Sequence, residues 1–261
     1  MSIYKAESKY VKNNVLIKIF GIISGLVGIF VVFLLSGSYG REVNIVQFVR
    51  EQYMGYIILA FIVPFQYANY FCSNFETGSI KNIVASGNSR TSFVITKFLK
   101  QASSAIKCVI WYSVGVVLIF ISTFMIVRNN ITFVGFSMYF VFEIFLKNII
   151  LCILLIYFSA LILLFSMIFK KETVSSLLTL FMLVADIVTT LRLSQSDAYT
   201  HIKTNLYFYK LVLIMEDFRF ADQTFADGIQ NFFGAIIIPI IITVILLGLS
   251  VLVFEKKDIV I

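Results

Sequence analysis

Six continuous runs of apolar residues constrain this chain more than any other feature of its sequence. A helix needs about 20 mostly apolar residues to cross about 30 Å of hydrocarbon. The runs cover residues 15–35, 53–72, 103–127, 136–169, 174–193 and 233–254. None of them alternates apolar and polar residues as the strands of an outer-membrane barrel do, so each run predicts a helix. The sequence therefore predicts an all-α integral membrane protein with six transmembrane helices in a single domain over residues 1–261.

The composition agrees with this prediction. Hydrophobic residues make up 60% of the chain and charged residues 13%, whereas soluble domains have about 45–50% and about 25%. These values exclude a soluble enzyme, a disordered chain and a disulfide scaffold. The three cysteines, Cys72, Cys108 and Cys152, lie singly inside apolar runs. We expect them to pack as small hydrophobic side chains.

The fourth run, over residues 136–169, is too long for one straight crossing. Glu143 and Lys147 lie four residues apart with the acid first, the order that favours an ion pair along a helix. We expect the helix to break near these two residues. The crossing itself is then predicted over residues 149–169.

The distribution of charge predicts the orientation, because cytoplasmic loops carry an excess of Lys and Arg. With the N-terminus in the cytoplasm, the inner side holds 13 Lys and Arg against 5 Asp and Glu, and the outer side 8 against 9. Six spans place both termini in the cytoplasm and predict a multi-pass protein of the bacterial cell membrane. The first run is longer than a signal-peptide core and no A-x-A site follows it, so we expect it to be retained.

Three connecting segments carry structure of their own. Residues 1–14 mix lysines with Ile, Tyr and Val, which favours a helix lying on the inner leaflet over an ordinary basic flank. In the first cytoplasmic connection a short helix is expected over residues 76–85. Ser89 then caps a helix that reaches Val127 and is about 58 Å long. Residues 205–232 are too charged to span and predict a re-entrant or outer hairpin.

The sequence lacks the motifs of catalysis. Its single histidine, His201, lies in the outer connection without a G-x-S-x-G motif, and there is no H-E-x-x-H, C-x-x-C or G-x-x-x-x-G-K-[ST]. We therefore expect no enzyme activity, no metal and no cofactor in this chain. The net charge is +7, and its basic residues lie at the ends of the spans, where they can bind anionic lipid. Nucleic acid is therefore not an expected partner.

Polar residues inside the spans are candidates for a translocation path. Thr179, Asp186 and Thr190 share a helical face with Ser175, and Gln66 and Asn69 share a face of the second span. Polar groups within a membrane mark functional sites by default, although hydrogen bonds between packed helices are the alternative. Gly21, Gly25 and Gly28 follow the small-residue spacing that allows close packing of helices.

The first cytoplasmic connection has a more specific pattern. Its residues 75–81 read FETGSIK, residues 86–90 read SGNSR, and Lys97 follows. This pattern resembles the inner loop of ABC-2 type permeases, the membrane subunits of ATP-binding-cassette exporters. The family also has six spans, an N-terminal interfacial helix and a re-entrant hairpin before the last span.

The resemblance implies one half of a type V exporter. A second permease subunit, identical or paralogous, would complete the channel, and two copies of a separate ATPase subunit would bind ATP and Mg in the cytoplasm. Residues 76–85 would be the coupling helix that enters a groove on the ATPase. The resemblance assigns Glu76, Gly78, Lys81 and Arg90 to this coupling site.

The substrate is predicted from resemblance alone. The small size and the Lys-, Ile-, Phe- and Asn-rich composition look like permeases of low-GC Gram-positive bacteria. Those proteins export, or confer resistance to, amphipathic peptides such as phenol-soluble modulins and lantibiotics. The alternatives are export of drugs, lipid or polysaccharide, and an ATP-independent carrier or channel. A carrier would favour inverted repeats, and none is evident in the sequence.

Overall fold

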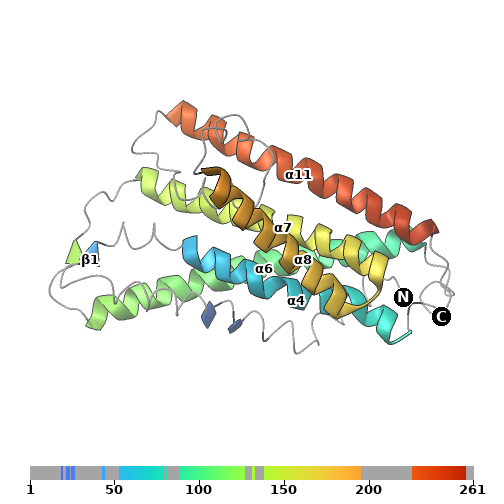
Figure 1. The fold of residues 1–261 in the computed structure, drawn as a ribbon. Coiled ribbons are helices and arrows are strands. Elements are labelled where there is room, and N and C mark those ends of the chain that lie inside the picture. The colour runs from blue at the N-terminus through green and yellow to red at the C-terminus, as the bar shows by residue number, and fades with distance from the viewer. Residues whose placement is uncertain are drawn as a thin grey trace.

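The structure, a computed structural model, describes residues 19, 22–23, 25–26, 43–44, 53–78, 80, 89–126, 131–132, 138–194 and 225–256. The described fold is helical, as predicted (Figure 1). Its helices are α4 (Tyr53–Glu76), α6 (Arg90–Ile126), α7 (Met138–Phe169), α8 (Glu172–Ser194) and α11 (Phe225–Lys256). The predicted interfacial helix at 1–14 and residues 205–224 of the predicted hairpin lie outside the described residues.

Two short strands join segments that are far apart in the sequence. Strand β1 (Val43–Asn44) pairs in parallel with β2 (Ile131–Thr132), and Val43 lies opposite Ile131. β1 follows the first apolar run and β2 follows α6. The pair therefore links two connections that the charge pattern places on the same side of a membrane.

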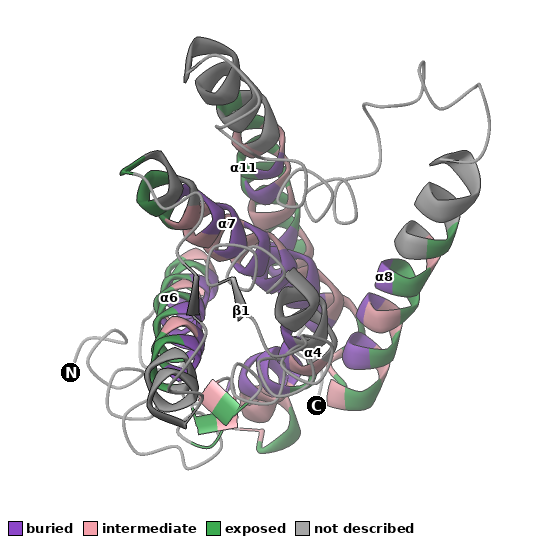
Figure 2. Cartoon of the chain, turned by 90° about the vertical axis from the view of Figure 1, so that its left-hand side faces the viewer, coloured by how far each residue is buried: buried purple, intermediate pink, exposed green. Residues whose placement is uncertain are grey.

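Helix α7 lies at the centre of the bundle and contacts α4, α6, α8 and α11. Its sequence is apolar on every face, which is expected of a helix surrounded by other helices. Leu151, Leu155 and Ile162 are fully buried. The end-on view of Figure 2 shows buried residues along the middle of α7 and exposed residues at one of its ends, while exposed residues occur along α6, α8 and α11.

The helices alternate in direction. Hydrogen bonds join Glu76, where α4 ends, to Glu172, where α8 begins, and join Arg90, where α6 begins, to Glu255 near the end of α11. Helices α4, α7 and α11 therefore end where α6 and α8 begin, at the right of Figure 1. The bundle thus has one end that collects all of these termini.

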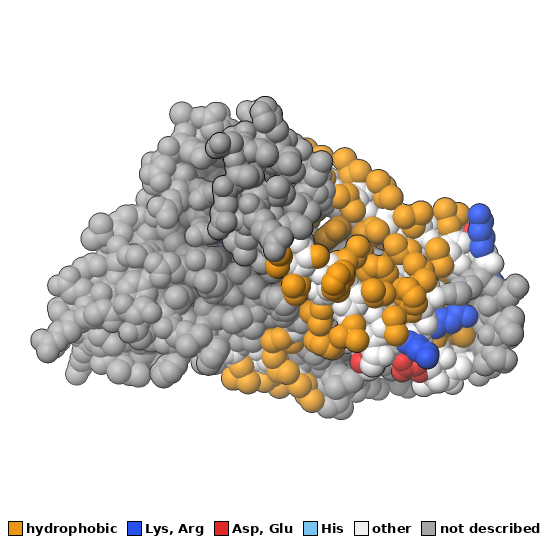
Figure 3. Space-filling model, in the orientation of Figure 1, with side chains coloured by type: hydrophobic (Ala, Val, Ile, Leu, Met, Phe, Trp, Pro, Cys, Tyr) orange, Lys and Arg blue, Asp and Glu red, His pale blue; other side chains and the backbone are white. Residues whose placement is uncertain are grey.

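Three helices in the described part are long and apolar enough to cross a membrane. Their apolar sections are Arg90–Leu118, Ile144–Phe169 and Ile236–Lys256, and that of α8 is shorter, at Glu172–Ala185. Large apolar side chains cover the described surface of Figure 3. Phe181, Val244 and Leu118 are each more than half exposed. Such a surface is suited to lipid rather than water.

Helix α6 has the long form that the sequence predicts. Its 37 residues span about 56 Å at 1.5 Å per residue. The Ser92 N–H donates to Ser89 Oγ at 3.1 Å, so Ser89 is the predicted N-cap. The helix is therefore much longer than the about 30 Å of hydrocarbon in a bilayer.

Two helix boundaries differ from the prediction. Helix α7 is continuous from Met138 to Phe169, and the break expected near Glu143 and Lys147 is not present. An unbroken helix satisfies its backbone groups internally, which an apolar environment strongly favours, and the Lys147 side chain is buried rather than solvated. Helix α11 begins at Phe225, so residues 225–232 extend the last helix instead of belonging to the hairpin predicted over residues 205–232.

Candidate functional site at the charged end of the bundle

The charged end is defined here as the helix termini that carry Glu76, Arg90, Lys170, Lys171, Glu172, Glu255 and Lys256. In Figure 3 the blue and red side chains gather at this end, and orange side chains cover the described surface behind them. The positive-inside rule assigns all of these residues to the cytoplasmic side. The structure brings them together from α4, α6, α11 and the turn between α7 and α8.

Arg90 joins the start of α6 to the end of α11. Its Nη1 donates to the carbonyl oxygens of Phe254 at 3.3 Å and Glu255 at 3.0 Å. The last carbonyl groups of a helix have no partner within the helix and carry partial negative charge, so a guanidinium is a suitable partner for them. The Thr91 hydroxyl adds a second link by donating to Glu255 Oε1 at 2.5 Å.

Aromatic side chains support this junction. The Phe254 ring packs edge-to-face on Phe75 of α4, with ring centroids 6.0 Å apart, and lies 5.8 Å from the Phe93 ring of α6. The Arg90 guanidinium lies over Phe254, 5.9 Å from the ring centre. Such contacts add to the apolar burial of the rings. The end of α11 is therefore held between α4 and α6.

Glu76 joins the end of α4 to the start of α8. Its Oε1 accepts a hydrogen bond from the Glu172 N–H at 3.1 Å, and a carboxylate is favoured at a helix N-terminus. In return, Glu172 Oε2 accepts from Asn69 Nδ2 at 2.8 Å. Two hydrogen bonds thus connect the two helices in a reciprocal arrangement.

Gly78 ends α4. Its φ of 66° lies in the left-handed region, which glycine adopts without a Cβ penalty. Its N–H donates to the Phe75 carbonyl at 3.2 Å, as in the αL ending of many helices. Lys81 lies outside the described residues. Of the coupling helix predicted over residues 76–85, the structure describes Glu76, Thr77, Gly78 and Ile80, and Ile80 is buried.

Lys97 is a buried cation close to the charged end. Its side chain is 0% exposed, and Nζ donates to the Tyr70 carbonyl oxygen at 2.7 Å. Nζ also lies 4.3 Å from the centre of the Tyr70 ring and 5.6 Å from that of Phe93. These contacts stabilise the charge where water is absent and fix α6 against α4.

The predicted path residues do not form one continuous lining. Thr179 is fully buried, and its hydroxyl donates to the Ser175 carbonyl at 2.8 Å. The Asn69 side chain donates a hydrogen bond to Glu172. Gln66 is buried, and neither its Nε2 nor its Oε1 atom has a hydrogen-bond partner among the described residues. Asp186 and Thr190 lie on α8, and their side chains lie outside the described part.

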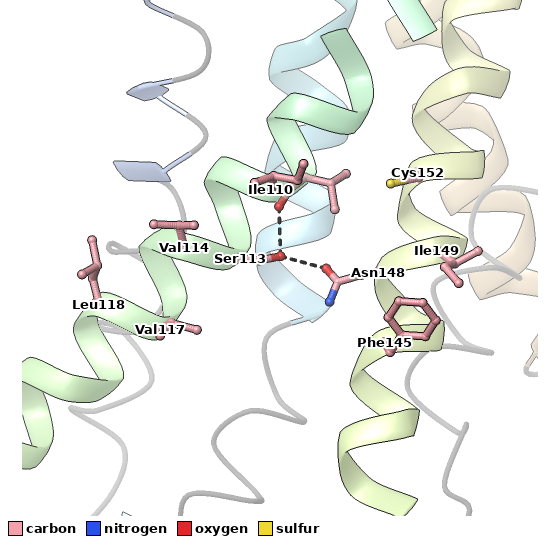
Figure 4. A pocket seen from close by; sticks show the side chains of 10 residues that line it. Ile110, Ser113, Val114, Val117, Leu118, Phe145, Asn148, Ile149 and Cys152 are labelled. Atoms are coloured by element: carbon pink, nitrogen blue, oxygen red, sulfur yellow. Dashed lines mark hydrogen bonds between the residues drawn. The ribbon is translucent and has the colours of Figure 1, made fainter. Parts of the chain in front are cut away.

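A groove of about 440 Å³ lies between α6 and α7. Its walls are apolar except for Ser113 and Asn148, which point toward each other in Figure 4. The Ser113 hydroxyl lies 2.9 Å from both Asn148 Oδ1 and the Val109 carbonyl oxygen, and Asn148 Nδ2 donates to the Ile144 carbonyl at 3.0 Å. The sequence analysis did not single out either residue.

The described polar contacts of the charged end join helices to one another. Among the described residues, no group of three or more His, Cys, Asp or Glu is arranged to hold a metal ion. Sequence analysis identified Glu76 and Arg90 but missed Phe254 and Glu255, which come from the far end of the chain. The one available signal was the change from an apolar run to charged residues after Phe254.

Comparison with known families gives one match that covers most of the chain. The chain belongs to the family described as "Protein of unknown function (DUF2705)", which matches residues 13–260. No curated protein matches the chain. The family match covers all five helices described above.

Proposed function

We propose that this chain is the membrane subunit of an ATP-driven exporter and that its charged end docks a separate ATPase. The proposed topology has six transmembrane helices in the bacterial cell membrane, with both termini in the cytoplasm. Two such subunits, identical or paralogous, would associate with two ATPase copies that supply ATP and Mg. Three apolar helices of spanning length and the ABC-2-like pattern over residues 75–97 support this proposal.

The observation that carries the proposal is the joining of Glu76 and Arg90 to other helices at one end of the bundle. Both residues belong to the ABC-2-like pattern, which is known for contact with an ATPase. Glu76 is bonded to the start of α8 and Arg90 to the end of α11. A force applied to residues 76–90 would therefore act directly on four helices, α4, α6, α8 and α11.

The proposed substrate is an amphipathic peptide, such as a toxin or an antimicrobial peptide. The broad apolar surface of the described helices supports this choice. A peptide that partitions into the inner leaflet would reach the bundle from the side, because apolar side chains bind it there. Drugs, lipids and polysaccharides are the alternative substrates of the same proposed machine.

Purification of the full chain from native membranes in mild detergent tests the proposal. We expect an ATPase subunit with a P-loop to copurify at about one copy per chain, because each coupling site docks one subunit. Glu76→Ala and Arg90→Ala should each reduce its recovery and the peptide-stimulated hydrolysis of ATP. Lys107→Ala is the control, because Lys107 is an exposed cation of α6 that lies outside both the pattern and the charged end.

The same experiment can contradict the proposal. A stable homo-oligomer without any ATPase, from cells that contain the intact chain, would point to an ATP-independent carrier or channel. Recovery of the ATPase with Glu76→Ala and Arg90→Ala at the level of the unmodified chain would show that docking uses other residues. Membrane insertion of each variant is checked first by its yield in the membrane fraction.

A further inference from the structure

A second group of polar residues lies inside the bundle and extends inward from the charged end. Gln66 and Tyr67 of α4, Gln101 of α6, and Ser159 and Ser166 of α7 are all buried, and none is more than 3% exposed. We call these five residues the inner polar seam. Gln66 lies ten residues before Glu76, which is about 15 Å along the helix axis. Gln66 is therefore shielded from bulk water, whereas Ser166, whose carbonyl accepts from the Lys170 N–H at 2.9 Å, lies next to the charged end.

Six polar atoms of the seam lack a partner in hydrogen-bond geometry within the described part of the chain, although the Ser166 hydroxyl lies beside the Cys72 thiol. The unpartnered atoms are both polar atoms of Gln66, the Tyr67 hydroxyl, Gln101 Nε2, and the Ser159 and Ser166 hydroxyls. The other buried hydroxyls differ. Thr179, Thr243 and Ser250 each donate to a carbonyl oxygen of their own helix. Buried polar groups are hydrogen-bonded in the great majority of cases, so this concentration requires an explanation.

Tyr67 shows how the three helices meet at the seam. Its electrostatic neighbours are Gln101 and Cys108 of α6 and Cys152 of α7. Although the Tyr67 hydroxyl lies beside Gln101, the two groups do not reach hydrogen-bond geometry. A small rotation would pair them, but it would leave the Gln66 amide without a partner.

The seam continues toward the charged end along α6. Lys97, Gln101, Ser104 and Cys108 follow one another at intervals of four, three and four residues, so they share one face of the helix. All four are buried. Lys97, bonded to the Tyr70 carbonyl, stands nearest to the charged end. A polar face therefore runs from the charged end into the interior of the bundle.

We propose that the inner polar seam is a binding site for a small, neutral, hydrogen-bonding group. Carboxamides and hydroxyls both donate and accept, so they match a ligand that does the same and carries no charge. Water entering from the charged end and the amide group of a bound peptide share this chemistry. Either one would satisfy Gln66, which no residue of the described part does.

Hydroxyl-radical footprinting of the full chain in lipid nanodiscs tests for water. Radicals formed from bound water oxidise the side chains beside it. We expect oxidation of Tyr67 although it is 0% exposed, and no oxidation of Tyr112, which is 1% exposed and has no unpartnered hydroxyl. In the double variant Gln66→Met and Gln101→Met, oxidation of Tyr67 should fall to the level of Tyr112.

Thermal unfolding provides an independent measurement. Replacing an unpartnered buried amide by an apolar side chain of similar shape stabilises a protein, whereas removing a satisfied amide destabilises it. We therefore expect Gln66→Met to lower the Tm by about 2–4 °C. Leu59→Met on the same helix is the control for a volume-conserving change, since Leu59 is equally buried. A rise in Tm for Gln66→Met would overturn the proposal.

Native mass spectrometry distinguishes the two sources of the ligand. A bound organic molecule that is lost from the Gln66→Met variant would identify a peptide or another amide as the occupant. An unshifted mass together with oxidised Tyr67 would identify water. An unshifted mass together with unoxidised Tyr67 would mean that the seam is empty, and the proposal would fail whether or not an ATPase binds the chain.

Discussion

Gly115 of α6 packs directly against the carbonyl group of Gly25, so closely that a Cβ atom on Gly115 would overlap the Gly25 oxygen. The same atom would lie 3.0 Å from the Gly25 carbonyl carbon, and backbone atoms cannot move aside as a flexible side chain can. Gly25 belongs to the small-residue spacing in the first apolar run. Gly25 thus takes part in a close approach to α6, as small residues allow, whereas Gly21 and Gly28 lie outside the described residues.

We expect Gly115→Ala to destabilise the protein by about 1–3 kcal/mol, the typical effect of overpacking. Gly248→Ala is the matched control, because a Cβ there meets no atom within 4 Å and alanine is the better helix former. Thermal unfolding in detergent measures both variants. Equal Tm values for the two would mean that the helices separate at little cost and that the close contact contributes no stability.

Arg90→Ala should loosen the end of α11. The variant loses two hydrogen bonds to the Phe254 and Glu255 carbonyls and the contact with the Phe254 ring. We expect faster amide hydrogen exchange in the last turns of α11 and no change in the middle of α7. Arg90→Lys should restore part of the protection, because an ammonium supplies the charge without the paired geometry. Unchanged exchange in Arg90→Ala would contradict the proposed junction.

Asn69→Asp should make stability depend on pH. The new carboxylate would face Glu172, which now accepts a hydrogen bond from Asn69, and two like charges would repel each other. A like charge nearby disfavours the ionised form of a carboxyl group, so the pair takes up a proton as the pH falls and the repulsion is lost. The Tm of the variant should therefore approach that of the unmodified chain on acidification.

Asn69→Leu is the control for that experiment. It removes the same hydrogen bond without adding a charge, so the Tm difference from the unmodified chain should change little between acidic and neutral pH. If Asn69→Asp and Asn69→Leu respond to pH in the same way, the carboxylate at position 69 does not face Glu172.

Lys97→Met should destabilise the contact between α4 and α6. Methionine fills a similar volume but loses the charge-assisted hydrogen bond to the Tyr70 carbonyl oxygen and the contacts with the Tyr70 and Phe93 rings. A hydrogen bond from a charged group contributes about 1.5–3 kcal/mol. Lys107→Met is the control, since Lys107 lies ten residues later on the same helix and is exposed. Thermal unfolding compares the two. A larger effect at Lys107 would mean that charge, rather than the buried contact, stabilises this part of the bundle.

The helices and the grouping of their ends were largely predictable from the sequence. Long apolar runs need internal backbone hydrogen bonds, so the positions of α4, α6 and α8 follow from hydropathy. Ser89 was recognisable as a cap because its hydroxyl and the following helical residues form a local motif. The charge rule groups the ends of α4, α7 and α11 because each is followed by charged residues.

The partners of the candidate residues were not predictable. Glu76 and Arg90 were identified by a local pattern, but Glu172 lies 96 residues from Glu76, and Glu255 lies 165 residues from Arg90. The sequence gives no spacing rule for contacts between separate helices. Thr179 and Gln66 are both polar residues within apolar runs. In the structure only Thr179 is hydrogen-bonded to its own helix, and the sequence does not predict this difference.

Hydropathy and charge act residue by residue along the chain, so the long apolar helices and their charged ends could be predicted from the sequence. The central position of α7, the contact of Arg90 with α11 and the burial of Gln66 without a partner among the described residues were evident only in the folded chain. Those outcomes depend on which faces of different helices meet. Side-chain shape and packing determine that choice, and a pattern within a single helix does not encode it.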